Sequence, residues 1–178
     1  MTQPFVEHAA GPVRSARVHT ALGDFTLVGD DLALTGVHYP DDVAPEDGSW
    51  GEPVEAERHP VLGEAAAQLR AYAAGERTGF DLPLRPGGTA FQRAAWSALL
   101  DIPYGQTRSY REQAEAVGRP TAVRAVGSAN GRNPLPLVIP CHRVVGSGGA
   151  PTGYAGGVAL KLRLLDLEAG RGRLPVGG

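Results

Sequence analysis

Residues 135–145 read LPLVIPCHRVV, and this segment decides how the rest of the chain is interpreted. Its apolar, β-branched start predicts a buried strand that Pro140 ends, because proline has no N–H to donate to a sheet. The only cysteine of the chain, Cys141, follows at once, with His142 and Arg143 behind it. A thiol beside two cationic groups is a candidate nucleophile with a lowered pKa. Most unpaired cysteines are small buried hydrophobes, however, and the Cys-His pair alone favours that packing role.

Length and composition indicate an ordinary globular chain. With 178 residues, of which 42% are hydrophobic and 20% charged, it can form one large domain or two small ones. A single cysteine leaves no intramolecular disulfide and no Cys-rich zinc site, and it fits a reducing compartment. No segment has the length or apolarity of a membrane span, and the N-terminus does not resemble a signal peptide. We therefore expect a cytoplasmic protein that makes no contact with a membrane.

Charge is divided unevenly along the chain, although the net charge is only −2. Residues 1–83 carry 14 Asp and Glu against five Arg, whereas residues 84–145 carry eight Arg against three acidic residues. A division of this kind predicts that the second half of the chain, and not the first, binds a polyanion.

The first part of the chain predicts a small antiparallel sheet with one helix. Alternating apolar residues indicate strands at 13–20, 25–28 and 32–39, an exposed loop at 40–57, and a helix at 61–73. Its histidines are scattered and are interpreted as surface or packing residues: His19, His38 and His59. No cluster with chemical potential is visible here.

The second part predicts mostly helices. Capping residues and helical spacing indicate helices at 90–100 after Thr89, at 110–117 after Ser109 with Glu112, at 122–130 after Thr121, and at 158–168. Two short helices joined by a Gly-containing turn in a basic segment predict a helix-turn-helix. Residues 122–129 offer no Asn, Gln or Lys to read base edges, but small side chains and Arg124 suit a narrow groove. An ordinary helical hairpin packed on the core is the alternative.

The second part also resembles a known family. Six runs carry the resemblance, in the family's order and spacing: Ile102-Pro103-Tyr104-Gly105, Ser109-Tyr110, Arg124-Ala125-Val126-Gly127, Asn133-Pro134, Ile139-Pro140-Cys141-His142-Arg143-Val144 and Tyr154-Ala155-Gly156-Gly157. They resemble the DNA-binding and active-site domain of the O6-alkylguanine-DNA alkyltransferases, also called methylated-DNA–protein-cysteine methyltransferases. The first part resembles the family's N-terminal domain only in its coarse strand-and-helix pattern.

The resemblance implies a fold and a division into domains. The expected class is α/β (α+β), with a small N-terminal sheet-plus-helix domain followed by a mostly helical domain that holds the helix-turn-helix and the active-site cysteine. Residues 1–84 would form the ribonuclease H-like domain and residues 85–170 the alkyltransferase domain. The aperiodic residues 171–178 would be a disordered tail.

A single-turnover alkyl transfer is the implied chemistry. Cys141 would attack the alkyl carbon of a flipped-out O6-alkylguanine and keep the group irreversibly as a thioether, with no cofactor and no metal. His142 would take the thiol proton through a water, and Glu168 would orient the imidazole. Tyr110 would supply a proton to the leaving guanine. Glutamates on helix surfaces are usually solvated, so only the family position selects Glu168.

The resemblance also implies how the DNA is held. Arg124 would fill the gap left by the extruded nucleotide, and Tyr110 would assist the flipping. Further DNA contacts would come from Ala125, Gly127 and Arg132. The base pocket and its hinge would be formed by Asn133, Val144, Val145, Tyr154, Ala155 and Gly156. The expected partner is double-stranded DNA bearing alkylated guanine, bound through the minor groove by a monomer, with O4-alkylthymine left open as a second substrate.

Two other classes of function remain as alternatives. A Cys-His-Glu hydrolase would use the same three groups for acyl transfer, but it would need an oxyanion hole and no helix-turn-helix. A catalytically silent binder of alkylation damage would share the scaffold, but relatives of that kind lack the cysteine. A measurement of mass gain on Cys141 separates these alternatives from repair.

Overall fold

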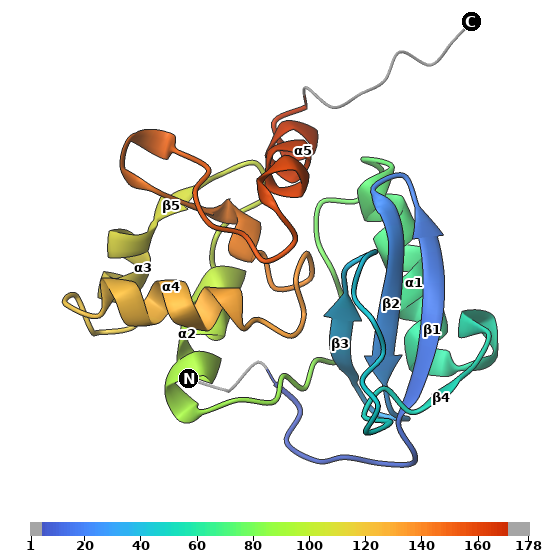
Figure 1. Ribbon diagram of the computed structural model, residues 1–178. Helices are drawn as coiled ribbons and strands as arrows, with labels where there is room; N and C mark the ends of the chain where they lie inside the picture. The colour runs from blue at the N-terminus through green and yellow to red at the C-terminus, as the bar shows by residue number, and fades with distance from the viewer. Residues whose placement is uncertain (1–4, 171–178) are drawn as a thin grey trace, which may run out of the picture. The chain divides into compact units, whose positions relative to one another are not determined.

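The computed structural model describes residues 5–170, and the chain divides into two units between Gly87 and Gly88. Figure 1 colours the chain from blue at the N-terminus to red at the C-terminus. The predicted tail at 171–178 lies outside the described residues. Within the described part of the chain, no helix is long and apolar enough to cross a membrane.

The first unit is a four-stranded sheet with one long helix. Its strands are β1 (Arg14–Thr20), β2 (Gly23–Gly29), β3 (Leu34–His38) and β4 (Glu52–Pro53), in the order β3-β2-β1-β4. β1, β2 and β3 are antiparallel, and the two-residue β4 pairs parallel to β1. The helix α1 (Pro60–Ala73) packs against β1 and β2 (Figure 1), with the one-turn helix η1 (Ala56–Arg58) before it. The predicted sheet and helix are confirmed, and β4 and η1 interrupt the predicted loop.

Apolar side chains from both layers form the core of this unit. Val18, Phe25 and Leu62 are fully buried between sheet and helix. His59 is buried as well, and its Nδ1 accepts a hydrogen bond from the Leu62 backbone N–H, 3.3 Å away, as the N-cap of α1. The interpretation of His59 as a packing residue therefore agrees with the structure.

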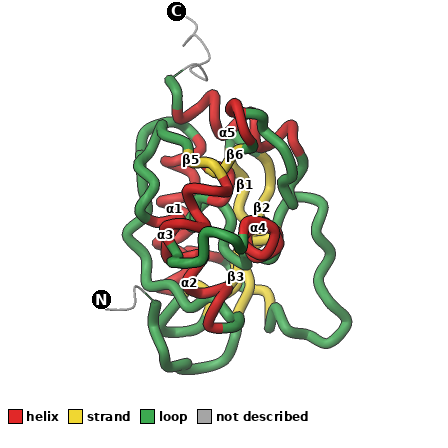
Figure 2. The backbone as a smooth tube through the Cα atoms, turned by 90° about the vertical axis from the view of Figure 1, so that its left-hand side faces the viewer, coloured by secondary structure: helices red, strands yellow, loops and turns green. Residues whose placement is uncertain are grey.

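The second unit is mostly helical. Its helices are α2 (Ala90–Leu100), α3 (Tyr110–Ala116), α4 (Val123–Gly131) and α5 (Val158–Glu168). Two short strands, β5 (Arg108–Ser109) and β6 (Val144–Val145), run parallel beside each other (Figure 2). One-turn helices stand at Cys141–Arg143 (η2) and Ser147–Gly149 (η3). The α+β class is confirmed, as is a helical domain whose α3 and α4 are joined by a short turn.

Side-chain caps explain why α2 and α3 begin where the sequence predicts. Thr89 and Ser109 each close a capping box, the first with Gln92 and the second with Glu112. The predicted cap of α4 is wrong. Ala122 occupies the N-cap position and offers no side-chain hydrogen bond, so α4 begins without the help that was expected from Thr121.

The predicted strand at 135–139 is also wrong. These residues are buried, but they form consecutive turns, with Leu137 in the left-handed region at φ 69° and the Ile139 N–H bonded to the Leu135 carbonyl at 2.8 Å. Pro136 and Pro140 remove two N–H groups from the segment, so it has few donors for a sheet. A short apolar run indicates burial more reliably than it indicates a strand.

Candidate active site

The only cysteine stands in a single helical turn at the edge of a cavity. Pro140 precedes η2, whose first residue is Cys141, and β6 follows directly. Cys141 is 5% exposed, and His142 is fully buried. The cavity measures about 410 Å³ and is lined by residues of α3, α4, η2 and the segment before α5: Tyr110, Gly127, Asn130, Gly131, Cys141, Gly153, Tyr154 and Ala155.

Asn133 ties the cysteine to the turns before it. Its amide nitrogen donates to the Ile139 carbonyl at 2.8 Å and lies 3.2 Å from the Cys141 Sγ. Its carbonyl oxygen accepts from the Leu135 N–H at 3.0 Å. The side chain therefore closes the 133–141 segment into one unit and supplies a donor to the sulfur. No sequence pattern indicates this contact with the sulfur, because the two residues are eight positions apart in an irregular segment.

His142 meets the carboxylate of Glu168 from α5. His142 Nε2 lies 2.8 Å from Glu168 Oε1, and both side chains are buried. Arg143 donates two hydrogen bonds to the same carboxylate, from Nε to Oε2 at 2.9 Å and from Nη2 to Oε1 at 3.0 Å. Its Nη1 donates to the Ile102 carbonyl at 2.6 Å, and the Gly105 N–H donates to Glu168 Oε2 at 3.1 Å. Glu168 is thus held by donors from three residues, His142, Arg143 and Gly105, and is not a solvated surface residue.

The electrostatics of Cys141 and His142 suit proton transfer at the moment of reaction. Burial raises the pKa of the Cys141 thiol, while the Asn133 amide and the Lys161 cation act to lower it. Burial lowers the pKa of His142, against the opposing effect of Glu168. A neutral imidazole beside a protonated thiol is the arrangement that a general base requires.

Tyr110 stands across the cavity at the start of α3. Its hydroxyl donates to the carbonyls of Thr152 and Gly153, at 3.3 and 3.4 Å. Burial, followed by the charge of Cys141, raises its pKa, so the phenol keeps its proton at neutral pH. The Gly127 Cα hydrogen faces this ring, because a Cβ built there would lie 3.8 Å from it. Tyr110 can therefore donate a proton into the cavity.

Lys161 is the residue that sequence reasoning missed. It is fully buried on α5, and its Nζ donates to the carbonyls of Val144 at 2.6 Å and Thr152 at 3.1 Å. Burial lowers its pKa, and the charge of Cys141 acts in the opposite direction. A signal was present in the sequence: Lys161 shares the buried face of its helix with Leu164 and Glu168, at helical spacing.

Four of the five predicted DNA-contacting residues lie on α4 or at its end, and the fifth, Tyr110, begins α3. Arg124 and Ala125 are exposed, Gly127 lines the cavity, and Arg132 is exposed with its Nη1 3.2 Å from the Ser128 hydroxyl. The C-terminal part of α4 is joined to α3 by two buried hydrogen bonds. The Asn130 amide nitrogen donates to the Gln113 amide oxygen at 2.7 Å, and the Gln113 amide nitrogen donates to the Asn130 amide oxygen at 3.0 Å. The exposed face of α4 is therefore held in place by this buried contact with α3.

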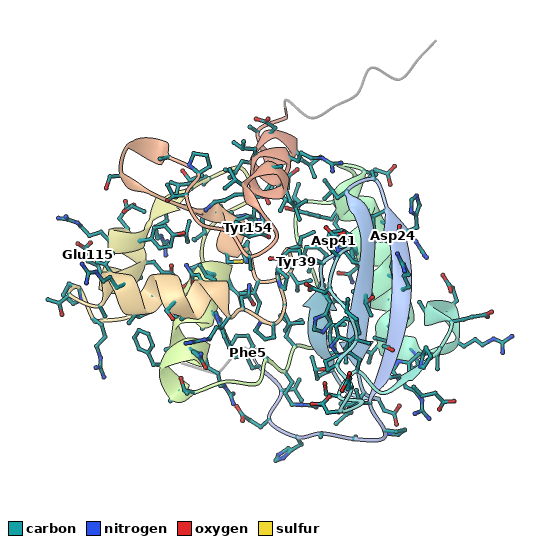
Figure 3. All side chains as sticks on the ribbon, viewed as in Figure 1. Phe5, Asp24, Tyr39, Asp41, Glu115 and Tyr154 are labelled. Atoms are coloured by element: carbon teal, nitrogen blue, oxygen red, sulfur yellow. The ribbon has the colours of Figure 1, made fainter. Side chains whose placement is uncertain are left out.

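The predicted pocket residues divide into two groups. Tyr154 and Ala155 line the cavity, and Figure 3 shows Tyr154 on the segment that leads into α5. Val144 and Val145 are buried in β6, and with Gly156 they are not among the lining residues. Asn130, Gly131 and Gly153 line it instead, which an apolar-pattern analysis could not show. Among residues 5–170, no group of three or more His, Cys, Asp or Glu is placed to hold a metal ion.

The fold and the site define a class of protein: a helix-turn-helix unit whose single thiol faces a cavity and is backed by a His-Glu pair, preceded by a sheet-and-helix unit. Comparison with known families agrees with this class. Residues 90–170 match the 6-O-methylguanine DNA methyltransferase DNA binding domain, and residues 13–86 match the ribonuclease-like domain of the same proteins. The chain belongs to the methylated-DNA–protein-cysteine methyltransferase family.

Individual relatives are similar along most of their length. The methylated-DNA–protein-cysteine methyltransferase of Mycolicibacterium paratuberculosis is 48% identical over 152 residues, 85% of this chain and 89% of the relative. The constitutive enzyme of Bacillus subtilis is 47% identical over 154 residues, 84% and 91% of the two chains. The crystal structure of Mycobacterium tuberculosis O6-methylguanine methyltransferase matches with a TM-score of 0.80 at 42% identity, covering 93% of this chain and 96% of that one. A structure of the Mycobacterium tuberculosis OGT protein in complex with DNA matches with the same score and identity over 89% and 94%.

Proposed function

We propose that this protein repairs DNA directly, by moving the alkyl group of O6-alkylguanine in a duplex onto Cys141, once per molecule. The observation that carries the proposal is that the only thiol of the chain lines a cavity of about 410 Å³ together with the Tyr110 phenol, while the next residue, His142, bonds the Glu168 carboxylate. The reaction class is that of a methylated-DNA–protein-cysteine S-methyltransferase, which matches the names of the relatives.

The transfer balances with the groups of this site. The Cys141 proton passes to His142 through a water molecule, because the side chains of adjacent residues cannot easily form a direct hydrogen bond. Glu168 stabilises the imidazolium that results. The thiolate forms a bond to the alkyl carbon, the bond from that carbon to guanine O6 breaks, and its electron pair stays on the guanine. Tyr110 then protonates the guanine, and the imidazolium of His142 returns its proton through water to the tyrosinate. The net change is one proton lost by the thiol and one gained by the guanine. The displacement as proposed needs no cofactor, because the thiolate supplies the electron pair.

The DNA side of the proposal rests on α4. Small residues at Ala125 and Gly127 let its backbone approach closely, which suits the minor groove. Arg124, exposed on the same helix, would enter the base stack and offset part of the unstacking cost, on the order of a few kcal/mol. Arg132 would contact phosphate, and Asn133 would act as the hinge between α4 and the cysteine. The pocket role of Val144, Val145 and Gly156 stays a prediction, as does activity on O4-alkylthymine.

Three further parts of the proposal concern the whole chain. We propose a ribonuclease H-like domain at 1–84 and the alkyltransferase domain at 85–170. The active form would be a monomer, because every group that the transfer uses comes from one unit of one chain. A cytoplasmic location fits a free thiol that must stay reduced to react.

Intact-mass spectrometry tests the function. The full chain is incubated with a duplex that carries one O6-methylguanine, with an unmodified duplex and a Cys141→Ser variant as controls. A single gain of one methylene mass on Cys141, never exceeding one per molecule, supports repair. Repeated turnover of an ester or peptide without mass gain would support the hydrolase, and tight binding without mass gain would support the damage binder. Either of the last two results overturns the proposal.

A further inference from the structure

Lys161 is an unusual residue for this chain. The sequence holds 17 basic Lys and Arg residues, and Lys161 is the only lysine among them. It is also fully buried, with an exposed fraction of 0%. Lysine is almost never fully buried unless a partner compensates its charge. The use of the only lysine at a buried position beside the cavity therefore calls for a partner.

The direct contacts of Lys161 are neutral. Its Nζ donates to the carbonyls of Val144 and Thr152, and it lies 5.9 Å from the ring centroid of Tyr110 and 6.0 Å from that of Tyr154. Among residues 5–170, no carboxylate forms an ion pair or hydrogen bond with it. Carbonyl dipoles and aromatic faces stabilise a cation in part, but burial of a charge is costly unless an anion compensates it.

The group that can become this anion is Cys141. Val144, which accepts the shorter hydrogen bond, lies three residues after the cysteine, and both tyrosines line the same cavity as the thiol. The Lys161 cation lowers the pKa of the thiol, and the charge of Cys141 raises the pKa of Lys161. The carboxylate of Glu168 is already neutralised by Arg143 and faces His142. Of the titratable groups around the sulfur, Tyr110, Tyr154 and His142 are not cations at neutral pH.

The contacts also give Lys161 a mechanical role. Val144 stands just before the loop at 146–157 and Thr152 lies inside it, so one ammonium group ties the loop to the strand from which it leaves. The Thr152 carbonyl accepts from Tyr110 as well. The position of the proton donor and the position of the cavity wall therefore depend on the same cation.

We propose that Lys161 is a positioning residue that supplies the counter-charge of Cys141 when the thiol ionises and that holds the cavity wall, and that alkylation of Cys141 prevents this pairing. The inference rests on the proposed function and deepens it. Before transfer, the site holds an ammonium beside a developing thiolate. After transfer, the sulfur is a thioether that cannot ionise, so the buried ammonium can no longer gain an anionic partner there.

A lysine suits this role better than an arginine. Its ammonium is a compact point charge that fits between two carbonyls and two aromatic rings, whereas a guanidinium is a planar fork that needs more room. The substitution Lys161→Arg keeps the charge, and Lys161→Met removes it with little change of length. Arg163→Met removes a charge from an exposed position of the same helix and serves as the matched control.

The first test uses the unmodified chain. Because the protein has one lysine, labelling with [6-13C]lysine gives a single NMR signal, whose pH titration reports Lys161 alone. The titration is recorded before and after Cys141 is alkylated with iodoacetamide. We expect the midpoint of Lys161 to fall by about one pH unit on alkylation, because a thioether cannot ionise and so cannot stabilise the ammonium as a thiolate does. One unit corresponds to about a tenfold change in the protonation equilibrium. An unchanged midpoint overturns the proposal, and no variant is needed.

The second test measures the thiol. The rate at which iodoacetamide modifies Cys141 is followed against pH in the unmodified chain and in the Lys161→Met, Lys161→Arg and Arg163→Met proteins, each checked for folding by circular dichroism. We expect the Met variant at position 161 to shift the profile to higher pH and to react about tenfold more slowly at pH 7, with partial recovery in the Arg variant. A folded Met variant with the unshifted profile overturns the proposal. Neither test uses DNA, so a failure of methyl transfer from a duplex would refute the proposed function separately.

Discussion

The two units of the protein each contain a buried carboxylate paired with an arginine, and the two pairs serve different purposes. Asp30 in the first unit and Glu168 in the second have side chains that are both 1% exposed. Arg85 binds Asp30, and Arg143 binds Glu168. Burial and ion pairing are thus alike, so neither property tells which pair belongs to the reaction.

The remaining donors make the difference. The other donors to Asp30 are backbone N–H groups, from Leu32 at 3.0 Å, Ala33 at 3.1 Å and Ala10 at 3.2 Å. Glu168 also accepts one backbone N–H, but its shortest contact is to the imidazole of His142. The first carboxylate holds a turn and the segment that crosses it. The second can respond to a proton, because one of its donors is titratable and stands next to the thiol. A buried ion pair therefore points to chemistry only when it also bonds a titratable group.

The largest expected effect comes from breaking the second pair. Glu168→Gln keeps the size of the side chain and removes the charge that stabilises a protonated His142. We expect the rate of methyl transfer to fall by about 100-fold or more, the range typical of general acid–base catalysis. Single-turnover assays with an O6-methylguanine duplex measure it, at a temperature where the folded fraction of the variant has been verified. A variant that is folded and transfers at the original rate would contradict the role assigned to Glu168.

The matching change in the first unit should spare the chemistry. Asp30→Asn leaves the half-buried Arg85 without its anion, and removal of one partner of a buried pair costs about 3 kcal/mol. Hydrogen exchange of the β1–β3 amides should show this loss in the free energy of opening. The transfer rate should stay within about twofold of the original, because Asp30 and its donors belong to the first unit and the groups of the transfer belong to the second. If the rate of methyl transfer fell equally in Glu168→Gln and Asp30→Asn, the two ion pairs would not differ in their importance for the reaction.

The backbone donor to Glu168 offers a smaller test. Gly105 has φ +76°, and a Cβ built there would lie 3.0 Å from the Glu168 backbone oxygen. Gly105→Ala should destabilise the second unit by about 1–2 kcal/mol, the cost of a left-handed conformation for an L-residue. Gly118→Ala is the matched control, since Gly118 has φ +68° with nothing within 4 Å. Equal losses in the free energy of unfolding of the two variants would mean that the left-handed dihedral angle alone causes the destabilisation. A larger loss at Gly105 sharpens the view that Glu168 is held by its surroundings.

Much of the fold could be predicted from the sequence because its signals are local. The helices at 90–100 and 158–168 have the predicted bounds, and the Thr89 cap and the Ser109 capping box are confirmed. The errors occur where the conformation of a short segment depends on side-chain hydrogen bonds that have no sequence period. The apolar run at 135–139 is buried as turns, and its conformation depends on the Asn133 side chain, which no periodicity could show.

The site was predictable in part for the same reason. Cys141 and His142 stand out as a sequence pair, whereas Glu168 was selected by resemblance alone. The Arg143 contact to Glu168 joins residues 25 positions apart, and Lys161 acts through carbonyls, which every residue carries. Such contacts follow from packing and leave no motif. The sequence nevertheless offered one hint, a lone lysine on the buried face of a helix.

The smallest expected effect is a pH dependence that separates the pairs without any change to the active site. Burial by itself raises the pKa of Asp30, but Arg85 and the backbone N–H groups outweigh it, so the folded-state pKa lies below the unfolded value of 3.8. A group with a depressed folded pKa stabilises the protein above its unfolded pKa and loses that contribution as the pH falls through the folded value. The difference in β1–β3 opening free energy between the unmodified chain and Asp30→Asn should therefore be constant above about pH 5 and shrink below pH 3.8. A difference that stays constant through strongly acidic pH would mean that the Asp30 charge does not hold the turn, and the contrast with Glu168 would then rest on shape alone.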